Sequence, residues 1–372
     1  MREIGIGIIG GGYMGKAHSV AMNAVGAAFE TNLRPRCEMI CTTTPEGAAE
    51  KARLFGFARS THDWRELVND PKVEAIVIAS TQDTHREIAL AAIAKGKAVM
   101  CEKPMGLGLD DARAMADAAE AVCVANMSAF NYIRTPASQL ARQIIEAGEI
   151  GDITYFRGEH TEDFFANPDT PANWRSHGRA NGNMGDLAPH IINAALAIAG
   201  PVKSLVADIE TVHKTRPGED GGTVEVTNDD QSQFLCRLES GAMGLLYVSR
   251  TATGRKMGYI YEVFGTRGSI RFDQEDQNAL WLYKSDQAKG REGFTKILTS
   301  PDSPDYWAFN KGPGHGTGYQ DQIIIEAHDF LKAIETGEPV WPTFRDGVRV
   351  SEIVEAAWLS HEERRWVNIE EV

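Results

Sequence analysis

The sequence predicts two domains of different class: a doubly wound α/β domain with a parallel sheet, then an α+β domain with a large, mostly antiparallel open sheet. Three observations support this prediction. The length of 372 residues exceeds that of one ordinary domain. Strand-like and helix-like segments alternate in the first third of the chain, as in βαβ units. Strand signals later follow one another with few helices between them, as in antiparallel sheets. The expected domains are residues 1–128 and 129–372.

The first domain is expected to consist of alternating strands and helices. The run at residues 73–80 is apolar on both faces, which is typical of a strand buried in a parallel sheet. Strands are expected at residues 4–9, 37–41, 73–80 and 98–101, and helices at residues 13–27, 46–55, 86–95 and 109–122.

The second domain begins and ends with helices around a run of strands. Helices are expected at residues 136–147, 189–199, 320–336 and 346–363, and strands at residues 202–209, 224–227, 232–238, 242–249, 258–264, 269–272 and 279–283. Residues 285–318 are polar, rich in glycine and proline, and irregular. Because a large antiparallel sheet needs a cover on its second face, and partner subunits commonly provide one, we expect a homodimer or homotetramer.

Composition excludes several classes of function. With 42% apolar and 24% charged residues, the chain has the composition of a soluble globular protein. The net charge is −14 and no run of Lys or Arg occurs, so no nucleic-acid partner is expected. No apolar run approaches the roughly 18 residues of a membrane span, and no signal peptide is evident. Five cysteines without a CxxC pair indicate a reducing, cytoplasmic setting and no zinc site.

A glycine-rich segment joins the first strand to the first helix. Gly10, Gly12 and Gly15 satisfy the spacing GxGxxG, and Tyr13 and Met14 lie between them. The first glycine permits a tight turn, the second lets a pyrophosphate approach the backbone, and the third lets the helix pack on the strand. The helix N-terminus adds free N–H groups for phosphates. We therefore expect a Rossmann-type dinucleotide site here, with a plain turn as the alternative.

The position expected to contact the cofactor ribose departs from the usual motif. An acidic residue is usual at the end of the second strand, and Thr42 stands there instead. Threonine lacks the charge that repels a 2′-phosphate, so NADP is not excluded. No Arg or Lys follows immediately, however, and Glu46 is near in sequence, which favours NAD. Thr42 is alternatively an ordinary residue at the end of a strand.

Several segments together resemble the glucose–fructose oxidoreductase / inositol dehydrogenase (Gfo/Idh/MocA) family. TQDTHREIALAAIAKGKAVMCEKP, residues 81–104, is similar to the family signature, although Gln82 and Asp83 stand where Pro-Asn is typical. FNYIRTPASQLARQIIEAGEIGDI at residues 130–153, GDLAPHIIN at residues 185–193, and the tail TFRDGVRVSEIVEAAWLSHEERRWVNI follow in the family's order. The resemblance covers nearly the whole chain, and it leaves the exact substrate open.

The resemblance implies catalytic roles for Lys103, Asp186 and His190. Oxidation of a secondary alcohol needs a base for the hydroxyl proton and a cation for the developing alkoxide. His190 suits the base, since imidazole titrates near neutrality, and Lys103 suits the cation. Pro104 disfavours a helical Lys103. If a helix begins at or just before Asp186, Asp186 and His190 share one of its faces. Which of Lys103 and His190 is the formal base stays open, and solvated loop charge is the alternative for Lys103.

The resemblance also implies cofactor contacts at the ends of two strands. Glu102 is expected near the nicotinamide ribose, Lys103 beside the cofactor, and Thr81 and His85 in the loop that lines the cofactor cleft. The carboxyl edge of a parallel sheet is where such folds bind ligands.

Three further residues are weaker candidates for substrate contacts. Arg175 lies in the loop before Gly185, and Tyr132 lies just past the domain junction. His315 lies among glycines in a long irregular loop, and such loops can reach a binding cleft. Packing, surface charge and a mobile loop are the alternatives for these residues.

The sequence as a whole favours an NAD(P)-dependent dehydrogenase of a cyclic polyol: an inositol, a sugar or an anhydrosugar. No metal is implied. A related NAD-dependent glycoside hydrolase, a dinucleotide-sensing regulator without catalysis, and a reductase of a non-sugar carbonyl or imine are the alternatives. Retention of both Lys103 and His190 speaks against the regulator.

Overall fold

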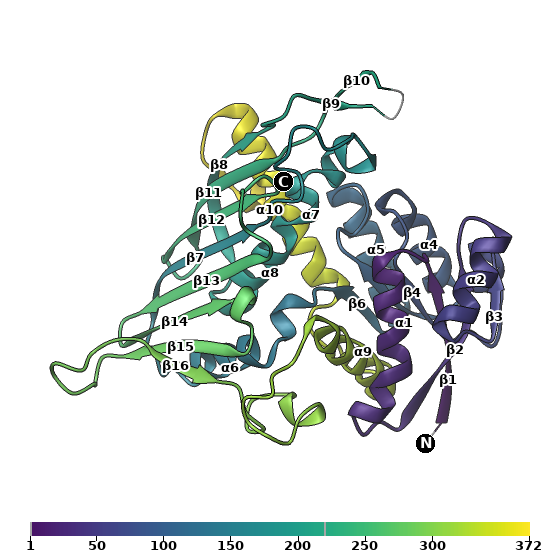
Figure 1. The fold of residues 1–372 in the computed structure, drawn as a ribbon, viewed down its shortest axis with the longest axis horizontal. Coiled ribbons are helices and arrows are strands. Elements are labelled where there is room, and N and C mark those ends of the chain that lie inside the picture. Colours follow the sequence, from purple (N-terminus) through teal and green to yellow (C-terminus); the bar gives the residue numbers. More distant parts are fainter. Residues whose placement is uncertain (1, 219–220) are drawn as a thin grey trace. The chain divides into compact units, whose positions relative to one another are not determined.

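The computed structural model describes residues 2–218 and 221–372 (Figure 1). By their internal contacts the residues form two units. The first comprises Met1–Arg134 and Gly318–Ser351, and the second comprises Thr135–Thr317 and Glu352–Val372. A segment near the C-terminus therefore groups with the N-terminal sheet, although the second unit separates them in the chain.

The first unit contains a six-stranded parallel sheet with the order β3-β2-β1-β4-β5-β6. The strand order reverses between β1 and β4, as in a doubly wound sheet. The predicted α/β class is thus confirmed. The elements are β1 (Arg2–Ile9), α1 (Tyr13–Ala28), β2 (Leu33–Cys41), α2 (Pro45–Phe55), β3 (Arg59–Thr61), α3 (Trp64–Asn69), β4 (Ala75–Ile78), α4 (Gln82–Ala94), β5 (Ala98–Glu102), α5 (Leu109–Val122), β6 (Asn126–Ala129) and, later in the chain, α9 (Tyr319–Thr336).

Helix starts in the first unit follow from capping chemistry. Helix α2 begins with Pro45, and the backbone N–H of Gly47 donates to the Thr44 hydroxyl at 3.1 Å. Helix α5 carries Asp110 and Asp111 in its first turn, where the helix dipole favours carboxylates. Strands β4 and β5 are buried along their whole length, so the carboxyl ends of these strands are held rigidly.

The second unit is built on a nine-stranded sheet with the order β16-β15-β14-β13-β7-β12-β11-β8-β17. Only the pair β7–β12 is parallel, so the predicted, mostly antiparallel sheet is confirmed. The elements are α6 (Pro136–Glu146), β7 (Ile153–Thr161), α7 (Asn183–Asp186), α8 (Ala188–Ile198), β8 (Val202–Glu210), β9 (Thr215–Pro217), β10 (Thr223–Glu225), β11 (Gln231–Leu238), β12 (Met243–Ser249), β13 (Gly258–Gly265), β14 (Gly268–Asp273), β15 (Ala279–Lys284), β16 (Thr295–Leu298) and β17 (Val367–Asn368). Helix α10 (Phe344–Glu363) spans the division between the units.

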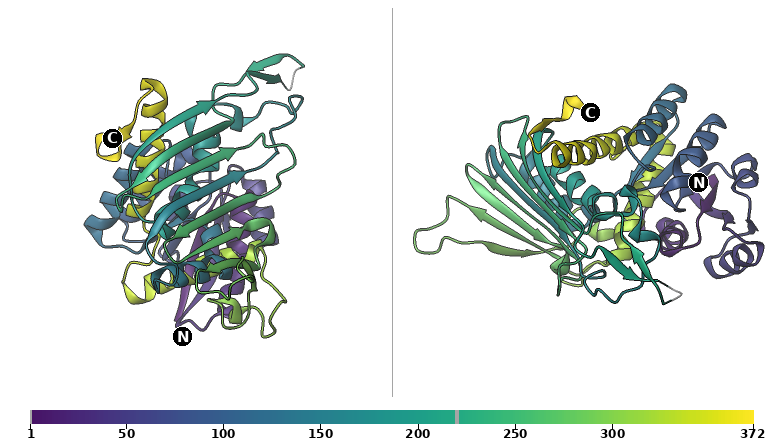
Figure 2. Two further views of the ribbon diagram at one scale, coloured as in Figure 1. Left: turned by 90° about the vertical axis from the view of Figure 1, so that its left-hand side faces the viewer. Right: turned by 90° about the horizontal axis from the view of Figure 1, so that it is seen from above.

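The two faces of this large sheet differ. Figure 2 shows the second unit's α6 and α8 against one face, while the other face is turned to the viewer in its left-hand view. Burial alternates strictly along β11, and Leu235 on the open face is 50% exposed. Leu235 pairs with Leu245, and Met243 pairs with Tyr155, so apolar side chains continue across three strands of this face.

Several elements differ from the sequence-based expectations. The structure adds β3, α3, β6, β7, α7, β9, β16 and β17, and β2 and α4 each begin four residues earlier than expected. Strand β7 was missed because Gly158 interrupts its alternating pattern. A Cβ atom on Gly158 would lie 2.7 Å from Cγ1 of Ile191, so the glycine is needed for α8 to pack on the strand.

Candidate functional site

The glycine loop after β1 has the geometry that a dinucleotide requires. Gly10 has a φ of +111°, and a Cβ atom there would overlap the carbonyl oxygen of Ala79. A Cβ atom on Gly15 would overlap the carbonyl oxygen of Gly10. A Cβ atom on Gly12, in contrast, would have no heavy atom within 4 Å. Packing therefore requires the first and third glycines, while the second leaves open space beside the start of α1, which fits a pyrophosphate.

Two side chains lie against this loop at the position expected for the ribose. A Cβ atom on Gly11 would lie 2.7 Å from Cγ2 of Thr42 and 3.1 Å from Cγ of Lys51. Thr42 thus stands beside the loop, as its place at the end of β2 predicts. Lys51 was missed, because it approaches the loop from α2, ten residues after the strand, and no motif marks it.

Three tyrosines gather near the same loop. The rings of Tyr13 and Tyr319 stack with centroids 5.9 Å apart, and the ring of Tyr132 lies 6.0 Å from that of Tyr319. The Tyr319 hydroxyl lies 3.4 Å from the sulfur of Met14. Burial raises the pKa of Tyr319, and the neighbouring tyrosines add to the shift. Tyr132 is thereby placed with the expected cofactor residues Tyr13 and Met14, and Tyr319, which the sequence analysis missed, joins them.

The segments after β4 and β5 are tied together by His85. Its Nδ1 lies 2.9 Å from the carbonyl oxygen of Pro104, and its Nε2 lies 3.1 Å from that of Ser80. Burial lowers the pKa of His85, which favours the neutral ring. His85 therefore holds the turn that carries Lys103, whose peptide bond to Pro104 is cis. Thr81 is exposed at the start of α4.

Glu102 points into the first unit. Its carboxylate lies 2.7 Å from Nε2 of His18 on α1, and both side chains are buried. Burial opposes protonation of His18, but its bond to Glu102 and that group's charge raise its pKa overall. Glu326 on α9 is fully buried and 3.6 Å from Nε of Arg134, and burial raises the pKa of Glu326 to about 7. The expected contact of Glu102 with the nicotinamide ribose remains a prediction; its carboxylate has a structural partner in His18.

In the second unit, Asp186 and His190 lie on consecutive short helices. Asp186 is the last residue of α7, Leu187 keeps helical backbone angles, and His190 is the third residue of α8. Asp186 accepts a hydrogen bond from Nε of Arg175 at 3.4 Å, and the Arg175 guanidinium lies 3.9 Å from the ring centre of Trp174. The structure thus brings the candidates Arg175 and Asp186 together in one ion pair. His190 is 6% exposed.

The backbone of Arg175 is held from behind by two buried side chains that the sequence analysis missed. Its carbonyl oxygen accepts hydrogen bonds from Arg250 and Asn228, both at 2.8 Å. Arg250 also donates to Asp230 at 2.9 Å and to Asn228 at 2.9 Å, and it is 1% exposed. Asp229 accepts from the backbone N–H of Met184 at 2.8 Å, which caps α7. No sequence motif marks these residues, because they meet only through the packing of β11 and β12 against the loop.

His315 is the candidate that remains. His315 is exposed in the loop before α9, where its ring packs against Gly312. Lys103 belongs to the first unit, and Asp186 and His190 belong to the second. Across residues 2–218 and 221–372, no three His, Cys, Asp or Glu side chains form a group that would hold a metal ion. In the same ranges, no helix has the length and apolarity needed to cross a membrane.

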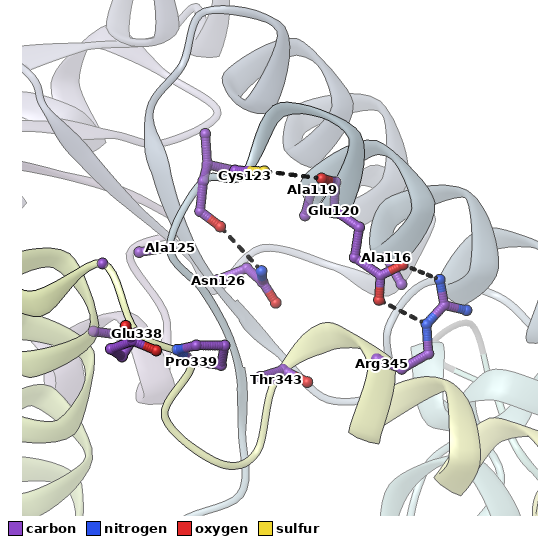
Figure 3. A pocket seen from close by; sticks show the side chains of 13 residues that line it. Ala116, Ala119, Glu120, Cys123, Ala125, Asn126, Glu338, Pro339, Thr343 and Arg345 are labelled. Carbon is purple, nitrogen blue, oxygen red and sulfur yellow. Dashed lines mark hydrogen bonds and ion pairs between the residues drawn. The ribbon is translucent and has the colours of Figure 1, made fainter.

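The first unit also contains a pocket of about 400 Å³ near the amino-terminal end of β6 (Figure 3). Asn126, the first residue of β6, lines it, whereas Lys103 follows the last residue of β5. Arg345 at its rim is paired with Glu120 at 2.7 Å and with Asp117 at 2.6 Å. The pocket is therefore distinct from the glycine loop and from the turn that carries Lys103.

Comparison with known proteins gives a consistent result. Residues 4–130 match a family model described as an oxidoreductase family with an NAD-binding Rossmann fold, and residues 138–271 match a GFO/IDH/MocA C-terminal domain. A levoglucosan dehydrogenase of Pseudarthrobacter phenanthrenivorans is 39% identical, with all of both chains covered. A myo-inositol 2-dehydrogenase of Thermotoga maritima is 26% identical over 99% of each chain. A solved levoglucosan dehydrogenase in complex with NADH and levoglucosan superposes with a TM-score of 0.96, 38% identity, and coverage of 99% of this chain and all of the other.

Proposed function

This chain belongs to the GFO/IDH/MocA family of NAD-binding oxidoreductases, and from that premise we propose that it oxidises a secondary hydroxyl group of a cyclic polyol. Among inositols, sugars and anhydrosugars, an anhydrosugar related to levoglucosan is the first substrate to test. The observation that carries the proposal is the similarity, over the full length, to a levoglucosan dehydrogenase, in a chain that has Lys103, Asp186 and His190.

The proposed cofactor is NAD, which accepts the hydride when bound. The open space beside Gly12 and the N-terminus of α1 would hold its pyrophosphate. Thr42 and Lys51 would contact its adenosine ribose. The Glu46 carboxylate is exposed in the first turn of α2, and it would disfavour the additional phosphate of NADP.

The proposed chemistry divides the proton and the charge between two side chains. His190 takes the hydroxyl proton as general base, and the Lys103 ammonium stabilises the developing alkoxide. Asp186, bonded to Arg175, orients a second hydroxyl of the substrate. Tyr132 and His315 are proposed as further substrate contacts. The Arg175–Asp186 pair supports a neutral, hydrogen-bonding substrate, because the acid is already matched by its own cation.

We also propose that the chain functions as a homo-oligomer in the cytoplasm. The open face of the nine-stranded sheet carries the apolar patch formed by Tyr155, Leu235, Met243 and Leu245, and a second copy would cover it. Cysteines 37, 41, 101, 123 and 236 are free thiols, as expected in a reducing compartment. Sedimentation analysis measures the oligomeric state.

The test is a matrix of substrates and cofactors. NAD and NADP are each combined with inositols, aldoses and anhydrosugars, and nicotinamide absorbance is followed. We expect turnover with NAD and at least one cyclic polyol. Lys103→Ala and His190→Ala should each lower kcat by at least about 100-fold on the best substrate, the scale of a lost acid–base group. Parental turnover in both variants would refute these roles.

The same matrix separates the alternatives. Product release without net formation of NADH would indicate a glycoside hydrolase with retained cofactor. Cofactor binding without turnover of any substrate would indicate a regulator. Activity on carbonyl or imine compounds alone would indicate a reductase of another substrate class.

A further inference from the structure

Trp174 is a large, exposed side chain that has no part in the proposed chemistry. It begins the 3₁₀ helix Trp174–Ser176 of the second unit, and it is 47% exposed. Single exposed aromatic residues are common on protein surfaces, and Trp307 and Trp366 of the same unit are exposed as well. The neighbours of Trp174 give its exposure a different significance.

One guanidinium group joins the Trp174 ring to Asp186. The guanidinium carbon of Arg175 lies 3.9 Å from the centre of the Trp174 ring, which is a cation–π distance. The Nε of Arg175 donates to Oδ2 of Asp186 at 3.4 Å. The indole ring and the Asp186 carboxylate thus contact the same cation. An apolar surface therefore lies beside the residue that is proposed to orient a second hydroxyl group of the substrate.

The backbone that carries Trp174 is fixed by hydrogen bonds on both sides. Oδ1 of Asn173 accepts from the backbone N–H of Arg175 at 2.9 Å, and Oγ of Ser176 accepts from the backbone N–H of Asn173 at 3.2 Å. The carbonyl oxygen of Ser176 accepts from the backbone N–H of Thr227 at 3.0 Å. The Trp174 ring is therefore held out from an ordered segment, so its contact with a ligand costs little additional conformational entropy.

A cyclic polyol has two kinds of surface. Its hydroxyl groups need hydrogen-bond partners, whereas the C–H groups between them are apolar and carry a small positive charge. The face of an aromatic ring is apolar and electrostatically negative, so it complements the C–H groups. Ligand sites commonly combine aromatic surface with a few placed polar groups. Trp174 and the Arg175–Asp186 pair form such a combination.

We propose that Trp174 is a substrate-binding residue, whose indole ring packs against the C–H groups of the cyclic polyol while Asp186 and Arg175 bind its hydroxyl groups. The inference rests on the proposed function, because it describes how the same site recognises its substrate. Trp174 lies in the second unit and the glycine loop lies in the first, and Trp174 has no contact with the cofactor in this arrangement. Loss of the ring therefore weakens binding of the polyol and leaves binding of NAD unchanged.

Three substitutions of Trp174 separate the aromatic face from apolar volume. Trp174→Ala removes the ring, Trp174→Leu keeps part of its volume, and Trp174→Phe keeps an aromatic face. Trp366→Ala is the matched control, because Trp366 is also 47% exposed and lies in the same unit. Melting temperatures of all four variants verify that folding is retained.

The first measurement is the KM for levoglucosan at saturating NAD, or for myo-inositol if levoglucosan is not turned over. We expect Trp174→Ala to raise this KM about 10-fold, the scale of a lost aromatic contact. Trp174→Phe should stay within about 3-fold of the parent, and Trp174→Leu should resemble Trp174→Ala. Trp366→Ala should have the parental KM, and fluorescence titration should give the parental Kd for NAD in every variant.

The second measurement detects the contact itself. Saturation transfer is recorded by NMR on the deuterated full-length protein, in which only the tryptophan rings carry hydrogen, with NADH bound so that the polyol is not oxidised. Irradiation of the indole hydrogens should saturate the C–H hydrogens of the polyol in the parent and in Trp366→Ala. At equal occupancy by the polyol, the transfer should be lost in Trp174→Ala. A tryptophan that only supports Arg175 would not produce this transfer.

The outcomes distinguish failure of this inference from failure of the proposed function. Turnover with a parental KM in Trp174→Ala, or an equal rise in Trp366→Ala, would overturn the inference and leave the proposed function standing. A raised KM in Trp174→Ala without saturation transfer in the parent would reduce Trp174 to a support for Arg175 and would also overturn it. A parent that binds NAD but neither binds nor oxidises levoglucosan or myo-inositol would overturn the proposed function and this inference together.

Discussion

The buried carboxyl of Glu326 provides a quantitative test of the electrostatics inside the first unit. Its replacement by glutamine keeps the shape of the side chain and removes the charge. Burial raises the pKa of Glu326 from 4.5 to about 7, so the folded protein binds a proton here more tightly than the unfolded chain. The contribution of this group to stability is therefore fully present below pH 4.5 and is lost as the pH rises to about 7.

The size of the effect follows from that shift. A difference of 7 − 4.5 = 2.5 pH units corresponds to about 3 kcal/mol in the free energy of unfolding. Glu326→Gln removes the loss of stability that accompanies ionisation of the carboxyl group as the pH rises. We therefore expect the variant to gain about 3 kcal/mol relative to the parent between pH 5 and pH 8. The pKa of about 7 already includes the attraction to Arg134 and His18, which favours the carboxylate and offsets part of the effect of burial.

The assay is urea unfolding of parent and variant at half-unit steps from pH 5 to pH 8. Glu335→Gln, at an exposed position on the same helix, is the control for the loss of a carboxylate that is not buried. A Glu326→Gln difference that is flat across this range would refute the reasoning. A variant that becomes relatively less stable as pH rises would show that the ion pair with Arg134 outweighs burial.

Two further predictions concern the candidate site. Gly12→Ala should fold with a near-parental melting temperature but bind NAD at least about 10-fold more weakly, because its methyl group enters the space of the pyrophosphate. Gly15→Ala should instead lower the melting temperature, because its methyl group overlaps Gly10. Fluorescence titration measures the affinity for NAD and calorimetry the melting temperature, and an unchanged NAD affinity in Gly12→Ala would contradict the cofactor placement. Arg250→Lys should raise KM more than it lowers kcat, because it loosens the Arg175 backbone. Arg216→Lys is the control, because Arg216 is equally buried and donates hydrogen bonds to the carbonyl oxygens of Phe165 and Asn167. Equal changes in KM in the Arg250→Lys and Arg216→Lys variants would mean that Arg250 has only a general structural role.

Local signals were sufficient to predict much of the fold. Helix α5 has the bounds expected from its acidic first turn and the apolar periodicity that follows, and α1 was expected within one residue of its end. The need for glycine at positions 10 and 15 was expected, and a Cβ atom at either position would overlap a carbonyl oxygen. The role of Gly12 toward a pyrophosphate stays a prediction. Asp186 and His190 were expected on one face of a helix only if that helix began at or just before Asp186; the chain forms two short helices there, and Asp186 ends the first while His190 lies in the first turn of the second.

The contacts that shape the site were not predictable in this way. The partner of Glu102 is His18, 84 residues away, and the partner of the Arg175 carbonyl is Arg250, 75 residues away. Neither pair has a characteristic spacing, since each depends on which strands become neighbours. His18 lies within α1 and Arg250 directly follows β12, and no motif in the sequence marks either residue. Their importance arises from burial, which turns a polar side chain into one that must find a partner.

The position of α9 has a consequence for biosynthesis. Its side chains complete the first unit: Gln322 bonds to Asn131 at 3.2 Å, Gln320 donates to the carbonyl of Ala17 at 2.9 Å, and His328 stacks on Phe29. The residues of α9 leave the ribosome only after residues 135–317. The nascent N-terminal sheet therefore lacks its contacts with α9 until nearly the whole polypeptide has been made. An N-terminal fragment that stops at residue 134 would leave exposed the surface that α9 covers in the full chain, and it would be prone to association through that surface.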